Sequence, residues 1–100
     1  MHLNALLERI EYTALGNVDI PVDDIVYDSR KVRPGVVFVC LEGASFDGHA
    51  YAAEAVKAGA AAVVAQHPVD VGDTPVILVQ DTRAALAQMS AAYFGYPAEK

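Results

Sequence analysis

The most constraining feature of this sequence is the run Val36-Val37-Phe38-Val39-Cys40-Leu41, which is apolar at every position. A strand with one solvated face alternates apolar and polar residues, whereas a strand covered on both faces is apolar throughout. The run therefore predicts a strand in the interior of a sheet that is covered on both sides. Pro34-Gly35, directly before it, is a turn signal.

The remaining patterns predict a single small α/β domain with a mostly parallel sheet flanked by helices. Its 100 residues are enough for one compact domain and too few for two. The spacing of apolar residues predicts the helices and strands, and glycine, proline and aspartate indicate where they begin and end. In chain order they are a short amphipathic helix at 3–10, strands at 24–28, 36–41, 60–65 and 75–79, and helices beginning at Asp47 and Asp81 and ending at Gly59 and near Gly95. The segment 11–22 is mixed and predicts no regular element.

Composition excludes several classes of function. The net charge is −6, from 13 acidic and 7 basic side chains, and the one basic cluster is Arg30, Lys31 and Arg33. A nucleic-acid-binding domain presents a dense basic face, so nucleic acid is not an expected partner. The start carries no signal-peptide pattern, and no apolar stretch approaches the roughly 20 residues of a membrane span. We therefore expect a cytoplasmic protein in which the lone Cys40 is a small buried hydrophobe.

Two loops follow strands and could bind a ligand, because ligands of open α/β sheets collect at the carboxyl ends of strands. In the first, Tyr27 to Arg30, Ser29 offers a hydroxyl and Arg30 a planar fork of donors. The alternative is that Asp28 and Ser29 only satisfy a turn. In the second, 43–49, glycines allow close backbone approach, and Phe46 could stack on a planar ring or pack back into the core.

Catalytic and metal motifs are missing from the sequence. His2, His49 and His67 have no ligand-like spacing to one another or to a cysteine, so no metal site is expected. His49 is expected to make a hydrogen bond or pack against its helix. Neither a Gly-x-x-x-x-Gly-Lys-Ser/Thr loop nor a Gly-x-Gly-x-x-Gly loop occurs, so no nucleotide triphosphate cradle is predicted. Residue patterns alone thus indicate a small α/β binding domain.

Four short motifs occur in a familiar order. They are Asp28-Ser29-Arg30, the Pro34-Gly35-x-x-Phe38 strand, the Gly43-x-x-x-Asp47-Gly48-His49 loop and the Ala55-x-x-x-Gly59-Ala60 helix end. Together they resemble the first domain of the muramyl-peptide (Mur) ligases, over essentially the whole chain. The resemblance implies that residues 1–100 form the amino-terminal, UDP-binding domain. It also implies that the central ATP-binding domain and the carboxyl-terminal domain lie outside these residues.

The resemblance further implies a role and a set of site residues. The domain would hold the uridine end of UDP-N-acetylmuramoyl-L-alanyl-D-glutamate for a ligase that adds the third amino acid of the stem peptide. Ser29 would hydrogen-bond the uridine, Tyr27 would line its site, and the facing wall would be Ala44, Ser45 and Phe46. Arg30 and His49 belong to the motifs and are further candidates. ATP and magnesium would serve the full-length enzyme, with no cofactor and no catalytic residue in this domain.

Two alternatives stay open at this point. One is the first domain of the Mur ligase that adds D-alanyl-D-alanine, and the other is a stand-alone nucleotide-sugar-binding module. The segment Ala92-Tyr93-Phe94-Gly95-Tyr96-Pro97 is similar to the aromatic-aromatic-x-x-Pro pattern of the ligases that add the third residue. It favours that branch, but it does not choose between L-lysine and meso-diaminopimelate.

Overall fold

A computed structural model describes residues 2–43 and 47–93 of the chain. In this part a five-stranded sheet has the order β1-β5-β4-β3-β2. The strands are β1 (Thr13–Leu15), β2 (Asp24–Val26), β3 (Val36–Val39), β4 (Ala62–Ala65) and β5 (Val76–Leu78). Strands β2 to β5 are parallel, and β1 is antiparallel to β5. The predicted mostly parallel α/β sheet is confirmed.

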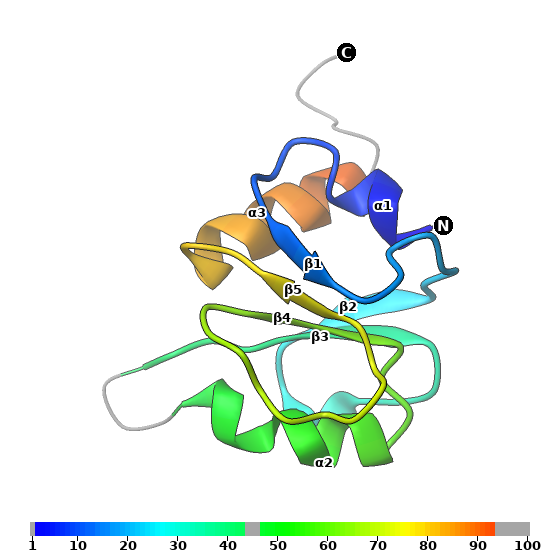
Figure 1. Cartoon of the computed structure of the whole chain (residues 1–100), viewed down its shortest axis with the longest axis vertical. Coiled ribbons are helices and arrows are strands. Elements are labelled where there is room, and N and C mark those ends of the chain that lie inside the picture. Colours follow the sequence, from blue (N-terminus) through cyan, green and yellow to red (C-terminus); the bar gives the residue numbers. More distant parts are fainter. Residues whose placement is uncertain (1, 44–46, 94–100) are drawn as a thin grey trace.

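Helices cover both faces of the sheet. The helices are α1 (Leu3–Leu6), α2 (Ala52–Lys57) and α3 (Thr82–Tyr93), with short 3₁₀ helices η1 (Ser29–Lys31) and η2 (Gly48–Tyr51). Figure 1 shows α1 and α3 together on one face and α2 on the other. Each face has its own apolar core, and the two cores are separated by the strands.

Strand β3 shows why an uninterrupted apolar run is needed. Its side chains alternate between the two cores, with Val37 and Val39 on the face of α1 and α3. Val36 and Phe38 pack on the face of α2. All four residues are buried, and β4 is buried at all four positions in the same way. Cys40, just beyond β3, is also fully buried, as expected.

The first helix, α1, ends at Leu6, short of the predicted residue 10, whereas the expected starts of the next two helices and the end of α2 are found. The Asp47 carboxylate accepts a hydrogen bond from the His49 backbone N–H at the start of η2. The Asp81 carboxylate accepts from two backbone N–H groups in the first turn of α3. After α2, Gly59 takes a φ of +111°, which favours glycine. The expected end of the last helix near Gly95 and Pro97 lies outside the described residues.

Two further details differ from the expectations. Strand β1 was not predicted, because all three of its residues are exposed and an exposed edge strand leaves no alternating pattern. The predicted helix from Asp47 to Gly59 begins as the 3₁₀ turn η2, where Tyr51 is 43% exposed, whereas Ala52 and Ala55 of α2 are buried. The reason is that Tyr51 lies in the tighter 3₁₀ turn of η2, which points it away from the core.

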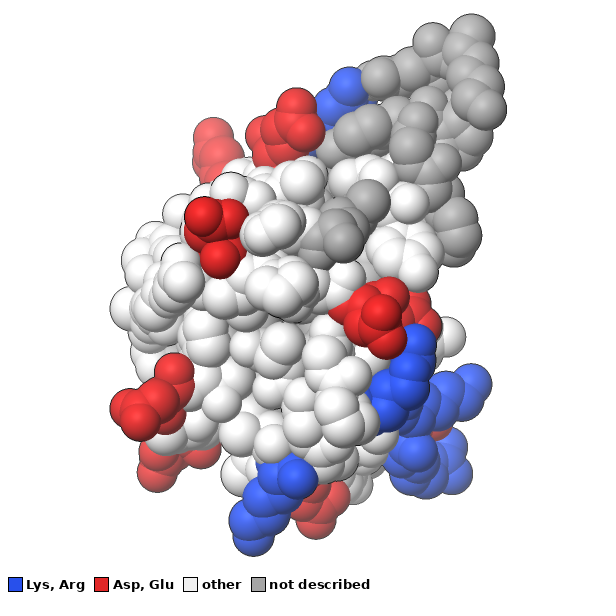
Figure 2. Space-filling model, turned by 90° about the vertical axis from the view of Figure 1, so that its right-hand side faces the viewer, with Lys and Arg blue, Asp and Glu red and all other residues white. Residues whose placement is uncertain are grey.

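Most of the surface on the face shown in Figure 2 is uncharged. On the face shown in Figure 2, the basic side chains form small groups bordered by acidic side chains. Arg33 pairs with Asp24 at 3.2 Å, and Arg30 pairs with Asp28 at 2.9 Å. Acidic partners thus offset much of the basic cluster. The longest of the described helices, α3, has 12 residues, so none of them could cross a bilayer.

Candidate functional site

The loops predicted to bind a ligand meet at one edge of the sheet. Because β2, β3 and β4 are parallel, their carboxyl ends lie at the same edge. The chain leaves β2 into Tyr27 to Arg30, and it leaves β3 into the loop that leads to η2. A surface hollow of about 560 Å³ lies between Tyr27 to Arg30 on one side and η2 and α2 on the other.

The hollow brings together three of the predicted residues. Its lining consists of Tyr27, Asp28, Ser29, Arg30, Phe38, Gly48, Tyr51 and Glu54. Tyr27, Ser29 and Arg30 are therefore placed where the sequence predicted a ligand site. Ala44, Ser45 and Phe46, the predicted facing wall, lie outside the described residues. His49 does not line the hollow.

Asp28 and Arg30 fix the backbone around Ser29. One oxygen of Asp28, Oδ1, accepts from the Arg30 backbone N–H at 2.9 Å and from its Nε at 3.1 Å. The other, Oδ2, accepts from Arg30 Nη2 at 2.9 Å. These hydrogen bonds, the side-chain pair first, lower the pKa of Asp28 to about 2 and raise that of Arg30. Asp28 is thus an N-cap of η1, as the structural alternative predicted.

The Ser29 side chain lies at the hollow. It is half-buried at the hollow, and within residues 2–43 and 47–93 no group hydrogen-bonds its hydroxyl. A hydroxyl can both donate and accept, which suits the mixed edge of a nucleobase. Asp28 therefore caps the turn, which is the structural role considered for both residues, and Ser29 remains a candidate ligand contact.

The opposite wall contains residues that the sequence reasoning missed. Tyr51 and Glu54 face the hollow from η2 and α2, and Phe38 of β3 lines it as well. The spacing of three residues between Tyr51 and Glu54 puts them on one helix side, which is a signal that could have found them. Gly48 lets this wall approach the chain just beyond β3 closely, since a Cβ there would lie 2.8 Å from the Leu41 nitrogen.

His49 lies in a separate cluster at the same edge. Its side chain is 3% exposed, and its Nε2 lies 2.9 Å from the Gln66 backbone nitrogen. A backbone N–H can only donate, so Nε2 accepts and the ring proton is on Nδ1. Nδ1 then donates to Asp47 Oδ1 at 2.6 Å. The prediction that His49 makes a hydrogen bond is confirmed.

Asp47 and Gln66 extend this cluster to neighbouring elements. The His49 backbone and ring hydrogen bonds lower the pKa of Asp47. The Gln66 side chain accepts from the backbone and hydroxyl of Thr82 at the start of α3. Arg83 donates to the Glu42 carbonyl at 3.0 Å. The loops after β3 and β4 and the start of α3 are therefore tied together.

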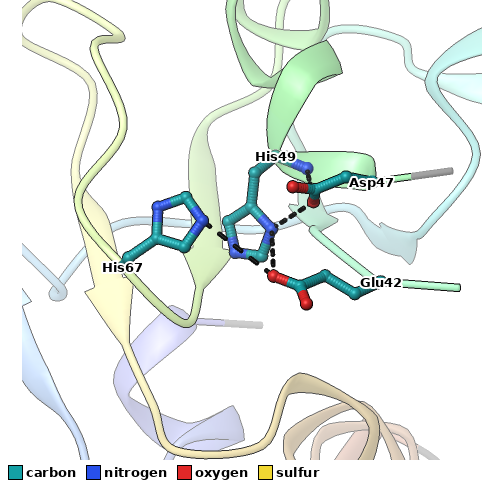
Figure 3. Close-up of side chains that lie close together, drawn as sticks. All are labelled: Glu42, Asp47, His49 and His67. Atoms are coloured by element: carbon teal, nitrogen blue, oxygen red, sulfur yellow. Dashed lines mark hydrogen bonds and ion pairs between the residues drawn. The ribbon is translucent and has the colours of Figure 1, made fainter.

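Two more side chains complete the cluster. The His67 ring stacks on the His49 ring with centroids 4.0 Å apart, and Glu42 Oε1 lies 3.6 Å from His49 Nδ1. Figure 3 shows these side chains with Asp47. Sequence spacing did not predict this proximity because His67 is 18 positions from His49 and follows a different strand. Parallel pairing of β3 and β4 brings their following loops together.

A family model described as "Mur ligase family, catalytic domain" matches residues 21–94. A UDP-N-acetylmuramoyl-L-alanyl-D-glutamate–2,6-diaminopimelate ligase of Clostridium perfringens is 43% identical over 102 residues, covering 100% of this chain and 21% of the relative. The ligase of the same name from Listeria monocytogenes serotype 4b is 39% identical, over 99% of this chain and 20% of its own. The chain thus spans about a fifth of the length of these curated relatives.

Solved structures share the fold. A crystal structure of MurF from Acinetobacter baumannii has a TM-score of 0.78 at 29% identity, covering 91% of this chain and 20% of that one. MurF ligase from Thermotoga maritima in complex with ADP has a TM-score of 0.65 at 33% identity, over 75% of this chain and 17% of its own. Both likenesses use only a small part of the larger protein.

Proposed function

Because the chain belongs to the Mur ligase family, we propose that it holds the uridine end of UDP-N-acetylmuramoyl-L-alanyl-D-glutamate for the ligase that adds the third stem-peptide residue. The hollow beside Ser29 is the site. Its volume of about 560 Å³ is within the range of roughly 300–1,000 Å³ that small-molecule sites occupy. The observation that carries the proposal is the Ser29 hydroxyl, which faces this hollow without a partner among the described residues.

The chemistry of the lining suits an uncharged planar ring. Tyr27, Tyr51 and Phe38 supply aromatic surface, and Ser29 supplies a donor and acceptor. The guanidinium of Arg30 is directed onto Asp28 by two hydrogen bonds. In this proposal Ser29 hydrogen-bonds the uracil edge, Tyr27 lines the site, and Arg30 supports the loop. Ala44, Ser45 and Phe46 form the facing wall.

The choice of the third-residue ligase rests on sequence identity. The relatives at 39% and 43% identity carry the name of the 2,6-diaminopimelate-adding ligase and align with nearly the whole chain. Their names favour meso-diaminopimelate over L-lysine for the protein to which this chain belongs. The second candidate is the ligase that adds D-alanyl-D-alanine. It is supported by the structural likeness to MurF, the ligase of that kind, although the sequence identity is lower at 29%.

The proposed role of this chain is anchoring, with the chemistry performed elsewhere in the ligase. The matching family model is described by the words "catalytic domain", but the 100 residues contain no phosphate loop. The Asp28 carboxylate at the hollow is engaged by Arg30. In this proposal ATP and magnesium are held by other parts of the ligase, and the location is cytoplasmic.

A titration tests the site. We expect UDP-N-acetylmuramoyl-dipeptide to shift the amide NMR signals of Tyr27, Ser29 and Tyr51, with UDP alone giving part of the effect. Ser29→Ala should weaken binding about tenfold, the effect of one lost hydrogen bond. Ser90→Ala, on α3, is the matched control and should bind normally. Signal shifts confined to α3, which does not line the hollow, would contradict the proposal.

The gene gives a second test. If the chain is part of the ligase, the reading frame continues past Lys100 into a strand followed by a Gly-Thr-x-Gly-Lys-Thr-Thr-like loop. A stop codon directly after Lys100 would instead favour the stand-alone nucleotide-sugar-binding module. An amino-acid-addition assay on the full-length protein separates the third-residue ligase from the D-alanyl-D-alanine-adding one.

A further inference from the structure

A cluster of metal-ligating side chains lies at the carboxyl edge of the sheet, apart from the hollow at Ser29. It consists of Glu42, Asp47, His49 and His67 (Figure 3), and one ligand atom of each lies within 4.8 Å of the other three. We propose that Glu42, Asp47 and His67 bind a divalent transition metal such as zinc. In this proposal His49 orients Asp47 without touching the metal.

His67 is prepared as a ligand by its tautomer. Its Nδ1 lies 3.3 Å from the Pro68 carbonyl oxygen, which can only accept, so Nδ1 carries the proton. The lone pair is then on Nε2, which lies 4.0 Å from Glu42 Oε1. Two electron-pair donors thus face each other, and a cation between them would satisfy both. Metal-binding histidines usually donate their other ring N–H to a carbonyl or carboxylate, as His67 does.

His49 is not available as a ligand. Its Nε2 accepts from the Gln66 backbone N–H, and its Nδ1 proton is donated to Asp47 Oδ1. A metal on Nδ1 would move the proton to Nε2, where it would face the Gln66 donor. His49 therefore holds Asp47 Oδ1 and leaves Oδ2 for the metal. A hydrogen bond of this kind orients a carboxylate toward a bound metal.

Exposure and donor type indicate the class of ion. The Glu42, Asp47 and His67 side chains are 47%, 48% and 53% exposed, so an ion can reach them from solvent. One imidazole and two carboxylates suit zinc better than magnesium, which prefers oxygen ligands only.

Binding requires a modest contraction of the cluster. Zinc–ligand bonds of about 2.0–2.2 Å place tetrahedral ligands roughly 3.4 Å apart. The exposed Glu42 and His67 side chains can make most of this movement by changing rotamers. A bound metal would then connect the loop after β3, which borders the proposed uridine site, to the loop after β4.

Zinc titration of the full chain by calorimetry tests the site, with cobalt absorption as a report on coordination. We expect one zinc per chain, and His67→Ala should weaken binding about 100-fold, with Glu42→Gln and Asp47→Asn each weakening it about tenfold or more. His2→Ala is the matched control, since His2 is 57% exposed and lies 3.8 Å from Asp19. It should leave the affinity unchanged. Circular dichroism checks that each variant is folded.

The nitrogen NMR signals of the imidazoles test the two histidine roles. Zinc should shift Nε2 of His67 while Nδ1 of His49 keeps its proton. Absence of zinc binding to the wild-type chain, or equal binding by folded His67→Ala, would overturn the site. Loss of the His49 Nδ1 proton on zinc addition would overturn its orienting role. These readouts need no substrate, so they are independent of the uridine proposal.

Discussion

The carboxylate of Asp28 accepts two parallel hydrogen bonds from the guanidinium of Arg30, at 3.1 Å from Nε and 2.9 Å from Nη2. Oδ1 also accepts from the Arg30 backbone N–H at 2.9 Å. The residue between them is Ser29, so this pair determines how the Ser29 hydroxyl is presented to the hollow. The two charged residues of the motif, Asp28 and Arg30, hydrogen-bond each other, which leaves Ser29 as the proposed ligand contact.

Arg30→Gln should therefore raise the pKa of Asp28 from about 2 toward the ordinary 3.8. The pKa should stay somewhat below 3.8 because the backbone hydrogen bond remains. Since the pair lowers this pKa in the folded state, its stabilising effect is complete above pH 4 or so and is lost as the pH falls toward 2. Carboxyl carbon NMR titration measures both values.

Lys31→Gln is the control for this prediction. Lys31 lowers the pKa of Asp28 only through its charge, as the smallest of the causes. The variant should change that pKa far less than Arg30→Gln does. Equal changes in the two variants would mean that charge alone, without the paired hydrogen bonds, is responsible.

Gly48→Ala should destabilise the chain by about 1–3 kcal/mol, the usual effect of overpacking. A Cβ at this position would lie 2.8 Å from the Leu41 nitrogen and 2.9 Å from the Leu41 oxygen, and neither backbone atom can move away easily. Urea unfolding measures the loss. The amide signals of Leu41 and Tyr51 should also shift, because η2 must move away from β3.

Gly72→Ala separates this steric effect from a backbone effect. Gly72 has a φ of +63° but no atom within 4 Å of the added Cβ. The substitution should cost about 1 kcal/mol through backbone strain, with no shift at Leu41 or Tyr51. A Gly48→Ala chain as stable as wild type would refute the close approach.

The layout of the fold could be predicted because its determinants are local. The apolar run from Val36 fixed the interior strand, while Asp47 and Asp81 marked helix starts. The ordered motifs also identified the Mur ligase family correctly. By contrast, β1 could not be predicted. Its residues are exposed and pair with β5 through backbone hydrogen bonds, which do not require an alternation of apolar and polar side chains.

One side of the candidate site comes from a single continuous motif, while the predicted facing wall at 44–46 lies outside the described residues. Tyr27, Ser29 and Arg30 follow β2 directly, so reading the strand located them. Glu42 and His67 come from different loops, and only the parallel register of β3 and β4 brings them together. Pairwise proximity between distant segments is a property of the register, which sequence spacing does not contain.

Gln66→Leu should lower the free energy of unfolding by about 1–3 kcal/mol, the cost of an unsatisfied buried donor. Thr82 is fully buried, and both its backbone N–H and its hydroxyl donate to Gln66 Oε1. Gln88→Leu, at an exposed site on α3, is the control and should stay within about 0.5 kcal/mol of wild type. Equal stabilities would show that Thr82 finds other acceptors.

Cys40 should be inert toward thiol reagents in the folded chain. It is fully buried beside β3, and burial raises the pKa of its thiol to about 12, so almost no thiolate is present at pH 8. Iodoacetamide should therefore label Cys40 only when the chain unfolds, so labelling should begin when guanidinium is added. Ala53→Cys, exposed on α2, supplies the control thiol in a Cys40→Ala background and should react in the native state. Rapid native labelling of Cys40 would mean that the core between β3 and α2 opens far more often than its complete burial indicates.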